Sequence, residues 1–386
     1  MIYADYNGSA PLSPAVREHL LKRIPDGPYA NPNAIHSLGK KMSMGIEKCR
    51  RLCAKVLGAK GSQVFFNSGA SEGISHVFFH LLSDPETLKN KPVVITSEIE
   101  HAAVIKACAY YESLGYQIKT IKTKVNGEID LSHLKELIES NKDQIAFVTV
   151  MAANNETGVI QPWKEVSKLC HENQIIFFSD TTQYIGKTDF NFADSGMDFA
   201  VMSGHKVGAM VGCGILLVKD PTTLKSYIFG GGQERGTRGG TQNYLGIETL
   251  AVALEDFSGK KAHLEELKKA RLQFERELKD EFSGVEIVGA DADRLATSTL
   301  IAYPGIHGQA VQIELESQDI FVTTSSACSD NNPETSRVLK AMGIDDQIGR
   351  GVVRISLCCG SSANDYNRIK AALSSIYKKL AKISSY

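Results

Sequence analysis

The sequence predicts an α/β protein with a mostly parallel central sheet, helices on both faces of that sheet and a smaller α+β domain. Three observations lead to this prediction. Short apolar runs alternate with helical patterns from about residue 60 to 220, and strands separated by helices are typical of right-handed βαβ units. A break follows at residues 258–261. At roughly 150 residues per domain, the 386 residues suffice for two domains.

The elements of the large domain follow in chain order. Ser13 before Pro14 is typical of a helix start, because serine caps the first amides and proline fits the first helical position. We expect strands at residues 64–66, 93–96, 145–150, 175–179, 199–202 and 214–218. We expect helices at residues 71–82, 102–114 and 244–257, the last one after a glycine-rich segment at 230–241.

The remainder of the chain predicts a smaller domain. A long, charged helix is expected at residues 263–282. It is followed by expected strands at 285–288, 297–302 and 352–357 and by a helix at 363–379. We therefore place the large domain at residues 13–258 and the small domain at 259–386, with residues 1–12 packing on the small one.

Composition excludes several classes of protein. The 43 basic and 44 acidic residues give a net charge of −1, which argues against a chain-wide basic surface for nucleic acid or anionic membrane. No apolar run approaches the ~20 residues of a transmembrane helix. The first residues show no secretory signal, and the eight cysteines lack zinc-type spacing. We expect a cytoplasmic protein with free thiols, no metal site, no membrane association and no direct contact with nucleic acid.

Two residues that end strands suggest a cofactor. Asp180 follows the strand at 175–179, and Lys206 follows the strand at 199–202. Taken singly, they would be a helix cap and a surface lysine. Together they suit pyridoxal phosphate, which needs a lysine for its aldehyde and a carboxylate for its ring nitrogen. The strand–turn–helix start at residues 68–71 offers backbone amides to a phosphate, and it matches neither a Walker A loop nor a dinucleotide fingerprint.

Further motifs make the sequence similar to the cysteine desulfurases, within the class V aminotransferase-like branch of fold-type I pyridoxal phosphate enzymes. They occur in family order along nearly the whole chain. They are Asp5-Tyr6, Asn31-Pro32, Ser68-Gly69-Ala70-Ser71-Glu72, Glu100-His101, Asn154-Asn155-Glu156-Thr157-Gly158, Asp180-Thr181-Thr182-Gln183, Ser203-Gly204-His205-Lys206, residues 230–241, Ser325-Ser326-Ala327-Cys328-Ser329 and Arg354-Ile355-Ser356-Leu357.

The resemblance implies a role for each cofactor contact. Lys206 would hold the cofactor and then move the substrate's Cα proton, and Asp180 would pair with the ring nitrogen. His101 would stack on the ring and act as an acid or base. Asn155 and Gln183 would bond the side of the phenolic oxygen. The phosphate would be bound by Ala70, Ser71, Ser203 and His205, and by Thr241 from the other subunit of a homodimer.

The resemblance also implies how the substrate binds and reacts. Arg354, with Asn31 and Asn155, would hold the carboxylate of L-cysteine. Cys328 would take the substrate's sulfur as a persulfide, leaving alanine. Its polar, turn-forming neighbourhood reads as an exposed loop, where a thiol can act as a nucleophile. The other cysteines, among them Cys358 and Cys359, read as buried apolar residues.

Several alternatives and departures from the family remain open. A selenocysteine lyase or a class V aminotransferase would use the same cofactor site, and a non-catalytic scaffold for sulfur carriers is a third possibility. Thr181 stands where the family commonly has alanine beneath the cofactor ring, and Gly73 should loosen its helix by ~1 kcal/mol relative to alanine. The chain lacks a longer C-terminal tail, which leaves the sulfur acceptor open between iron–sulfur assembly and tRNA or DNA thiolation.

Overall fold

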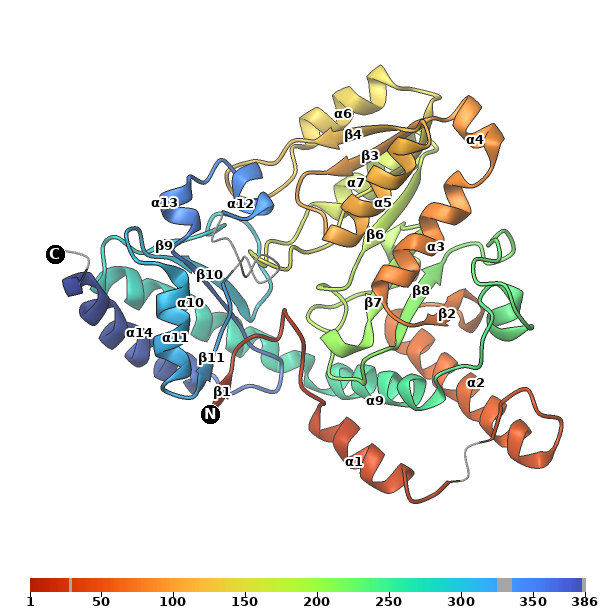
Figure 1. The fold of residues 1–386 in the computed structure, drawn as a ribbon, viewed down its shortest axis with the longest axis horizontal. Helices are drawn as coiled ribbons and strands as arrows, with labels where there is room; N and C mark the ends of the chain where they lie inside the picture. The colour runs from red at the N-terminus through yellow and green to blue at the C-terminus, as the bar shows by residue number, and fades with distance from the viewer. Residues whose placement is uncertain (28–29, 325–334, 384–386) are drawn as a thin grey trace.

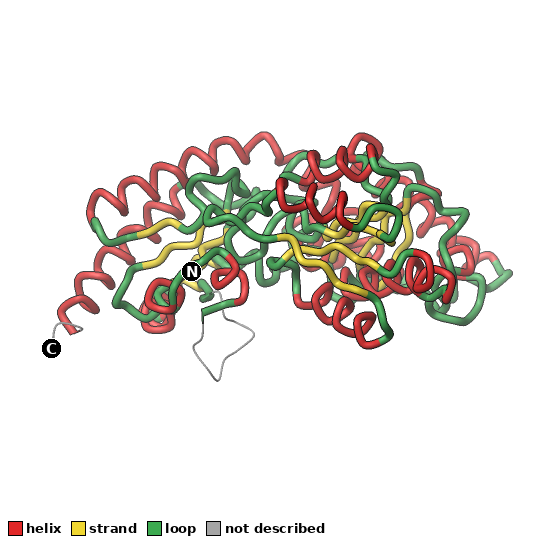
Figure 2. The backbone as a smooth tube through the Cα atoms, turned by 90° about the horizontal axis from the view of Figure 1, so that it is seen from above, coloured by secondary structure: helices red, strands yellow, loops and turns green. Residues whose placement is uncertain are grey.

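The computed structural model describes residues 1–27, 30–324 and 335–383. Two groups of strands are visible, each covered by helices (Figures 1 and 2). In the part of the chain that the structure describes, no helix is both long and apolar enough to cross a membrane. The expected α/β architecture is confirmed.

The larger sheet has seven strands in the order β2-β8-β7-β6-β5-β3-β4. Strand β8 runs antiparallel to both of its neighbours, and the remaining pairs are parallel. The strands are β2 (Val64–Asn67), β3 (Val93–Ser97), β4 (Gln117–Ile121), β5 (Ile145–Thr149), β6 (Ile176–Asp180), β7 (Phe199–Ser203) and β8 (Gly214–Val218). Only β4 was not expected from the sequence. It is an edge strand with four of its five residues at least partly exposed, so it lacks the apolar run of a central strand.

Helices cover both faces of this sheet. One face packs on α3 (Ala70–Leu82) and α5 (Ala102–Ser113). The other face packs on α2 (Ser37–Leu57), α6 (Leu131–Ser140), α7 (Trp163–Glu172) and α9 (Tyr244–Lys260). Successive strand residues alternate between the faces, as Phe65 and Phe66 do. Full burial of such a side chain stabilises the fold by about 1.5–3 kcal/mol.

The C-terminal part of the chain forms a second core. The elements of this part are α10 (Leu264–Glu281), β9 (Glu286–Ile287), β10 (Ser298–Ala302), α11 (Gly308–Glu316), β11 (Ile320–Phe321), α12 (Arg337–Ala341), α13 (Asp346–Gly349), β12 (Val352–Ser356) and α14 (Asn364–Ile383). The apolar side chains of α12 and α13 pack on the first core instead. Strands β12, β10 and β9 form an antiparallel sheet. The N-terminal strand β1 (Ile2–Tyr3) pairs in parallel with β11. Residues near the N-terminus therefore pack on the C-terminal core.

Shorter elements connect these layers. They are α1 (Pro14–Arg23), α4 (Pro85–Asn90), α8 (Phe192–Ser195) and the 3₁₀ turns η1 (Gly61–Gln63), η2 (Gly204–Lys206), η3 (Gln233–Gly236) and η4 (Lys261–His263). Ser13 caps α1, accepting the Val16 amide at 3.2 Å, and Pro14 is its first residue. The break expected to begin at residue 258 lies inside α9, which runs on to Lys260 before η4. The division into domains at that point stays a prediction.

Candidate active site

Four neighbouring strands end at one edge of the large sheet, and the expected site residues follow them. Asp180 ends β6, and Ser203 ends β7 just before His205 and Lys206 in η2. Because β3, β5, β6 and β7 are parallel neighbours, their carboxyl ends meet, which is where open α/β sheets bind ligands. A cavity of about 230 Å³ lies there. It is lined by Ala70, Ser71, His101, Met151, Ala153, Asn155, Asp180, Thr182, Gln183, Ser203, His205 and Lys206.

The Lys206 amine bonds the N-terminal segment. Its Nζ donates to the carbonyl oxygens of Asn7 at 2.9 Å and Gly8 at 2.5 Å. Ala10 extends this contact, because its amide donates to the His205 carbonyl at 2.9 Å. Residues 7–10 therefore orient the amine at the edge of the cavity.

Asp180 carries a carboxylate in a largely dry position. Its side chain is only 5% exposed, and Oδ1 accepts the Thr182 amide at 2.9 Å. A second carboxyl, Glu100, lies near it and is fully enclosed. Burial raises the pKa of Glu100 to about 8, and the proximity of Asp180 contributes to the rise, although bonds from Ser97 and Met151 oppose it. Glu100 is therefore mainly protonated at neutral pH.

The start of α3 forms the other end of the cavity. Gly69 occupies the N-cap with φ 151° and offers no side chain to the first amides. The Ala70 amide donates to the Ser203 hydroxyl at 2.8 Å, which links α3 to the end of β7. A helix N-terminus concentrates unpaired N–H groups and positive potential, so this end of the cavity favours an anion.

His101 caps α5. Its Nδ1 accepts the Ala103 amide at 3.2 Å. A neutral ring that accepts at Nδ1 carries its proton on Nε2. The residue is thus both a helix-start histidine and a lining residue of the cavity.

Three expected site residues do not line this cavity within the chain. Thr241 is exposed. Asn31 is also exposed, in the turn before α2, and accepts the Asn33 amide at 2.9 Å. Arg354 is buried and bonds Asp5 at 2.6 Å and the Asn155 carbonyl at 2.9 Å. Cys328 lies outside the described residues.

The structure places Thr181 differently from the expectation. Thr181 does not lie beneath a ligand in the cavity, because its buried hydroxyl donates to the Val201 carbonyl at 2.8 Å. Thr182 lines the cavity instead, and its buried Oγ1 has no partner among the described residues. Period-two alternation beyond Asp180 could have indicated this.

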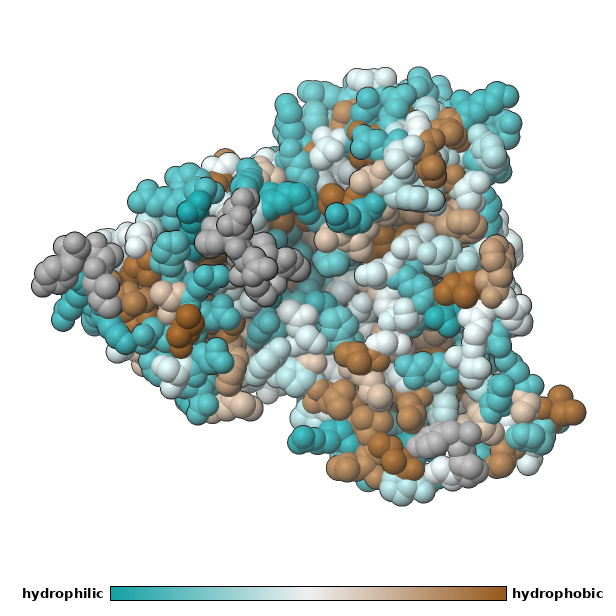
Figure 3. All heavy atoms as spheres, viewed as in Figure 1, coloured by the Kyte–Doolittle hydropathy of each residue, from teal (hydrophilic) through white to brown (hydrophobic). Residues whose placement is uncertain are grey.

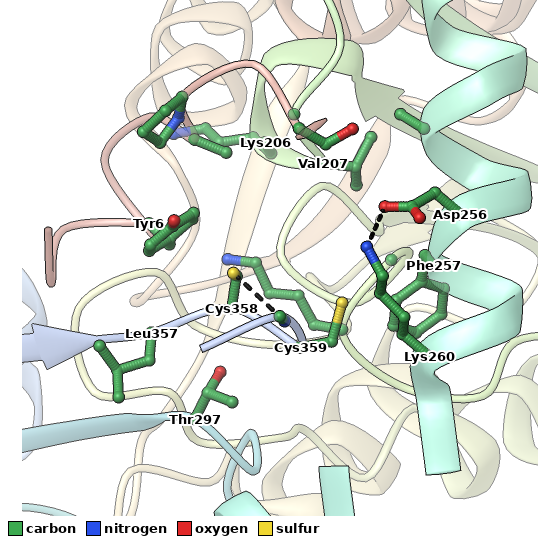
Figure 4. A pocket seen from close by; sticks show the side chains of 18 of the residues that line it. Tyr6, Lys206, Val207, Asp256, Phe257, Lys260, Thr297, Leu357, Cys358 and Cys359 are labelled. Atoms are coloured by element: carbon green, nitrogen blue, oxygen red, sulfur yellow. Dashed lines mark hydrogen bonds and ion pairs between the residues drawn. The ribbon is translucent and has the colours of Figure 1, made fainter. Parts of the chain in front are cut away.

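Cys358 and Cys359 are half-buried rather than buried. They line a second cavity of about 100 Å³ that shares Lys206 with the first. Figure 4 shows the two thiols close together, with the Asp256–Lys260 ion pair nearby. The cysteines follow the last strand of the small sheet and therefore lie at its edge, where the apolar pattern of the strand no longer guarantees burial.

Sequence reasoning also missed Asn7 and Lys187, both buried next to the cavity. Lys187 stands four residues after Gln183, and that spacing was the available signal. No group of three or more His, Cys, Asp or Glu side chains that could hold a metal ion occurs among residues 1–27, 30–324 and 335–383.

A lysine and a carboxylate at the carboxyl ends of adjacent parallel strands, beside a helix N-terminus, define a fold-type I pyridoxal phosphate enzyme. The model of the aminotransferase class-V family matches residues 2–369. The chain belongs to this family, whose cofactor is pyridoxal phosphate.

Similar proteins agree with this assignment. A cysteine desulfurase from Nostoc sp. is 32% identical over 388 residues, covering 100% of this chain and 95% of the relative. A solved NifS-like protein has a TM-score of 0.87 and 31% identity, covering 98% of this chain and 100% of the other. The structure of SspA in complex with cysteine has a TM-score of 0.79 and 29% identity, covering 92% and 99%.

The residues of the cavity fit pyridoxal phosphate. The start of α3 would take the phosphate, Asp180 the ring nitrogen and Lys206 the aldehyde carbon. The Thr182 hydroxyl adds a buried polar group that has no hydrogen-bond partner among the described residues, and a bound cofactor could supply one.

Proposed function

We propose that the protein is a cytoplasmic cysteine desulfurase, which converts L-cysteine to L-alanine and holds the sulfur as a persulfide on Cys328. The convergence of Lys206, Asp180 and His101 on one cavity, in a chain with full-length desulfurase relatives, supports this most. The seven described cysteines are all free thiols, which suits a reducing compartment.

The predicted catalytic and substrate-binding residues each have a task. Pyridoxal phosphate, when bound, supplies an electron sink for the Cα of the amino acid. The Asp180 carboxylate holds the proton of the ring nitrogen, and the Lys206 amine removes the proton from Cα. His101 donates or accepts a proton at Nε2 near the substrate. Arg354, with Asn31 and Asn155, binds the substrate carboxylate, a planar task that suits a guanidinium.

Cys328 performs the sulfur transfer. Its thiolate attacks the Sγ of the substrate, and a sulfur–sulfur bond forms as the Cβ–Sγ bond breaks. The electron pair of the broken bond stays with Cβ, which takes up a proton and becomes a methyl group. Lys206 then returns a proton to Cα, and the product is alanine. The persulfide then passes its outer sulfur to an acceptor protein of iron–sulfur assembly or of tRNA or DNA thiolation.

A homodimer would complete the site. Thr241 is exposed and does not line the cavity of its own chain, so its phosphate contact requires a second copy. Large apolar side chains are exposed on α1 and near the start of α2, namely Leu21, Ile24, Ile35 and Met44. Brown residues gather over α1 at the lower edge of Figure 3. Such a patch is typical of an interface. Each copy would contain a cofactor-binding domain at residues 13–258 and a small domain at 259–386.

The decisive test is mass spectrometry of the intact protein after treatment with L-cysteine. We expect a gain of one sulfur atom that maps to the Cys328 peptide, together with free alanine. Cys328→Ser should lose both products while keeping the visible absorbance of the cofactor. Cys49→Ser, which changes a half-buried helical thiol, is the matched control and should retain both.

The same experiment separates the alternatives. Formation of a keto acid without sulfur release would indicate an aminotransferase. Turnover of selenocysteine with no reaction of cysteine would indicate a selenocysteine lyase. Absence of any cofactor absorbance after reconstitution would leave a non-catalytic scaffold.

A further inference from the structure

The Gln183 side chain faces the cavity, and its amide can present either an acceptor or a donor to a ligand there. Gln183 is 4% exposed and has two partners outside the cavity. Its Nε2 donates to the Asn7 carbonyl at 2.9 Å, and its Oε1 accepts a hydrogen bond from the Lys187 amine. The hydrogen-bond partners of the amide therefore determine whether its oxygen or an N–H group faces the cofactor.

Lys187 is a buried amine with no role in the proposed chemistry. It is 7% exposed, and its Nζ donates to the Asn7 Oδ1 at 2.6 Å as well as to Gln183. Both acceptors are uncharged amide oxygens. Burial lowers its pKa well below the ordinary value, and the nearby Lys206 and Arg354 cations add to this, whereas Asp5 and Cys358 oppose it.

Asn7 connects this amine to the catalytic lysine. Its carbonyl oxygen accepts from both Lys206 and Gln183, at 2.9 Å each. Its own side-chain amide is fixed as well, because Nδ2 donates to the Ser298 hydroxyl at 3.1 Å and Oδ1 accepts from Lys187. Asn7 is 1% exposed, and its hydrogen bonds hold the side chains of Lys187 and Gln183 in place.

These contacts fix the orientation of the Gln183 amide. A lysine that donates two N–H bonds can face only the amide oxygen, and a backbone carbonyl can face only the amide nitrogen. Rotating the amide by half a turn would break both bonds. We propose that Lys187 is a positioning residue, which locks the Gln183 amide so that its second N–H, and not its oxygen, faces the cofactor. This donor suits the phenolic oxygen of pyridoxal phosphate, an acceptor when ionised.

The test measures the bound cofactor in the absence of cysteine. Lys187→Met keeps the length of the side chain but donates no hydrogen bond. We expect the pH midpoint of the cofactor's visible absorbance change to shift by about 0.7 pH unit, the equivalent of one net hydrogen bond. Cofactor binding to the apo-protein should weaken by about fivefold, followed through the fluorescence of Trp163, the single tryptophan, which packs against Tyr184.

Two further variants show whether Lys187 acts through Gln183. In a Gln183→Ala background, Lys187→Met should cause no additional shift of the midpoint. Lys187→Gln, which retains an N–H donor, should show only part of the shift that Lys187→Met causes. Lys260→Met removes a lysine of the neighbouring cavity that is paired with Asp256 at 2.8 Å, and it should change neither measurement.

Two results would overturn the inference. One is an unchanged midpoint in Lys187→Met, and the other is a full shift that persists in the Gln183→Ala background, since Lys187 would then act by its charge alone. The inference rests on the proposed cofactor contact of Gln183. Because neither readout requires sulfur release, a failure of the cysteine assay would count against the proposed function and leave this test intact.

Discussion

At the scale of single residues, two carboxyl groups lie at the site or directly beside it. Asp180 lines the cavity, where the cofactor ring would lie. Glu100 is 1% exposed, and its Oε2 has no partner in the described part of the chain. A buried carboxyl with an incomplete set of hydrogen bonds favours its neutral form.

The raised pKa of Glu100 predicts how the stability of the cofactor-free protein depends on pH. Between about pH 4.5 and 8, folded Glu100 holds a proton that the unfolded chain has released. The free energy of unfolding therefore falls as pH rises through this window, by up to about 1.4 kcal/mol per pH unit. Glu100→Gln should remove that decrease in urea unfolding measured across the window. Parallel curves for the variant and the natural protein would contradict the assignment.

At the scale of elements, the start of α3 shows that packing overrides helix propensity. Gly73 lies in the first turn, where the sequence suggests only a loss of helix stability. In the fold, a Cβ at this position would lie 2.7 Å from Cγ1 of Val201 on β7 and 3.0 Å from Nδ2 of Asn67. The glycine thus lets the helix that would bind the phosphate approach the sheet closely.

We expect Gly73→Ala to destabilise the protein. The clash with the buried Val201 costs about 1–3 kcal/mol, which exceeds the roughly 0.5–1 kcal/mol gained in helix propensity. Gly45→Ala in α2 is the matched control, because a Cβ there meets nothing within 4 Å, and it should stabilise by about 0.5–1 kcal/mol. Urea unfolding of both variants measures the difference, and equal stabilisation by both would refute the packing argument.

At the scale of the whole molecule, the N-terminal segment joins the two cores at the site. Ala4 bonds β11 and β12 through its backbone, and Asp5 pairs with Arg354 at 2.6 Å. The following residues, Asn7 and Gly8, bind the Lys206 amine. Residues more than 300 positions apart in the sequence thus support one cavity.

A second copy of the chain should add the last contact. Thr241→Ala should weaken cofactor binding by about fivefold, the effect of one hydrogen bond, and Lys206→Ala should abolish turnover. When the two variants are co-expressed, each mixed dimer has one intact and one doubly defective site, so the purified mixed dimers should show about half of the natural activity per dimer. Activity at limiting cofactor, measured on dimers purified through two tags, checks this. No recovery would mean that Thr241 serves its own subunit.

The sequence by itself determined the fold class, most central strands and the polar residues that line the cavity at the strand ends. Buried strands require apolar residues, so they appear in the sequence as apolar runs. Motifs such as Ser203–Lys206 are contiguous, so they can be recognised from the sequence as well. The tertiary structure decided the closeness of Asn7 to Lys187 and Gln183 and the burial of Glu100. Each depends on contacts between segments far apart in the chain, whose directions no local pattern encodes.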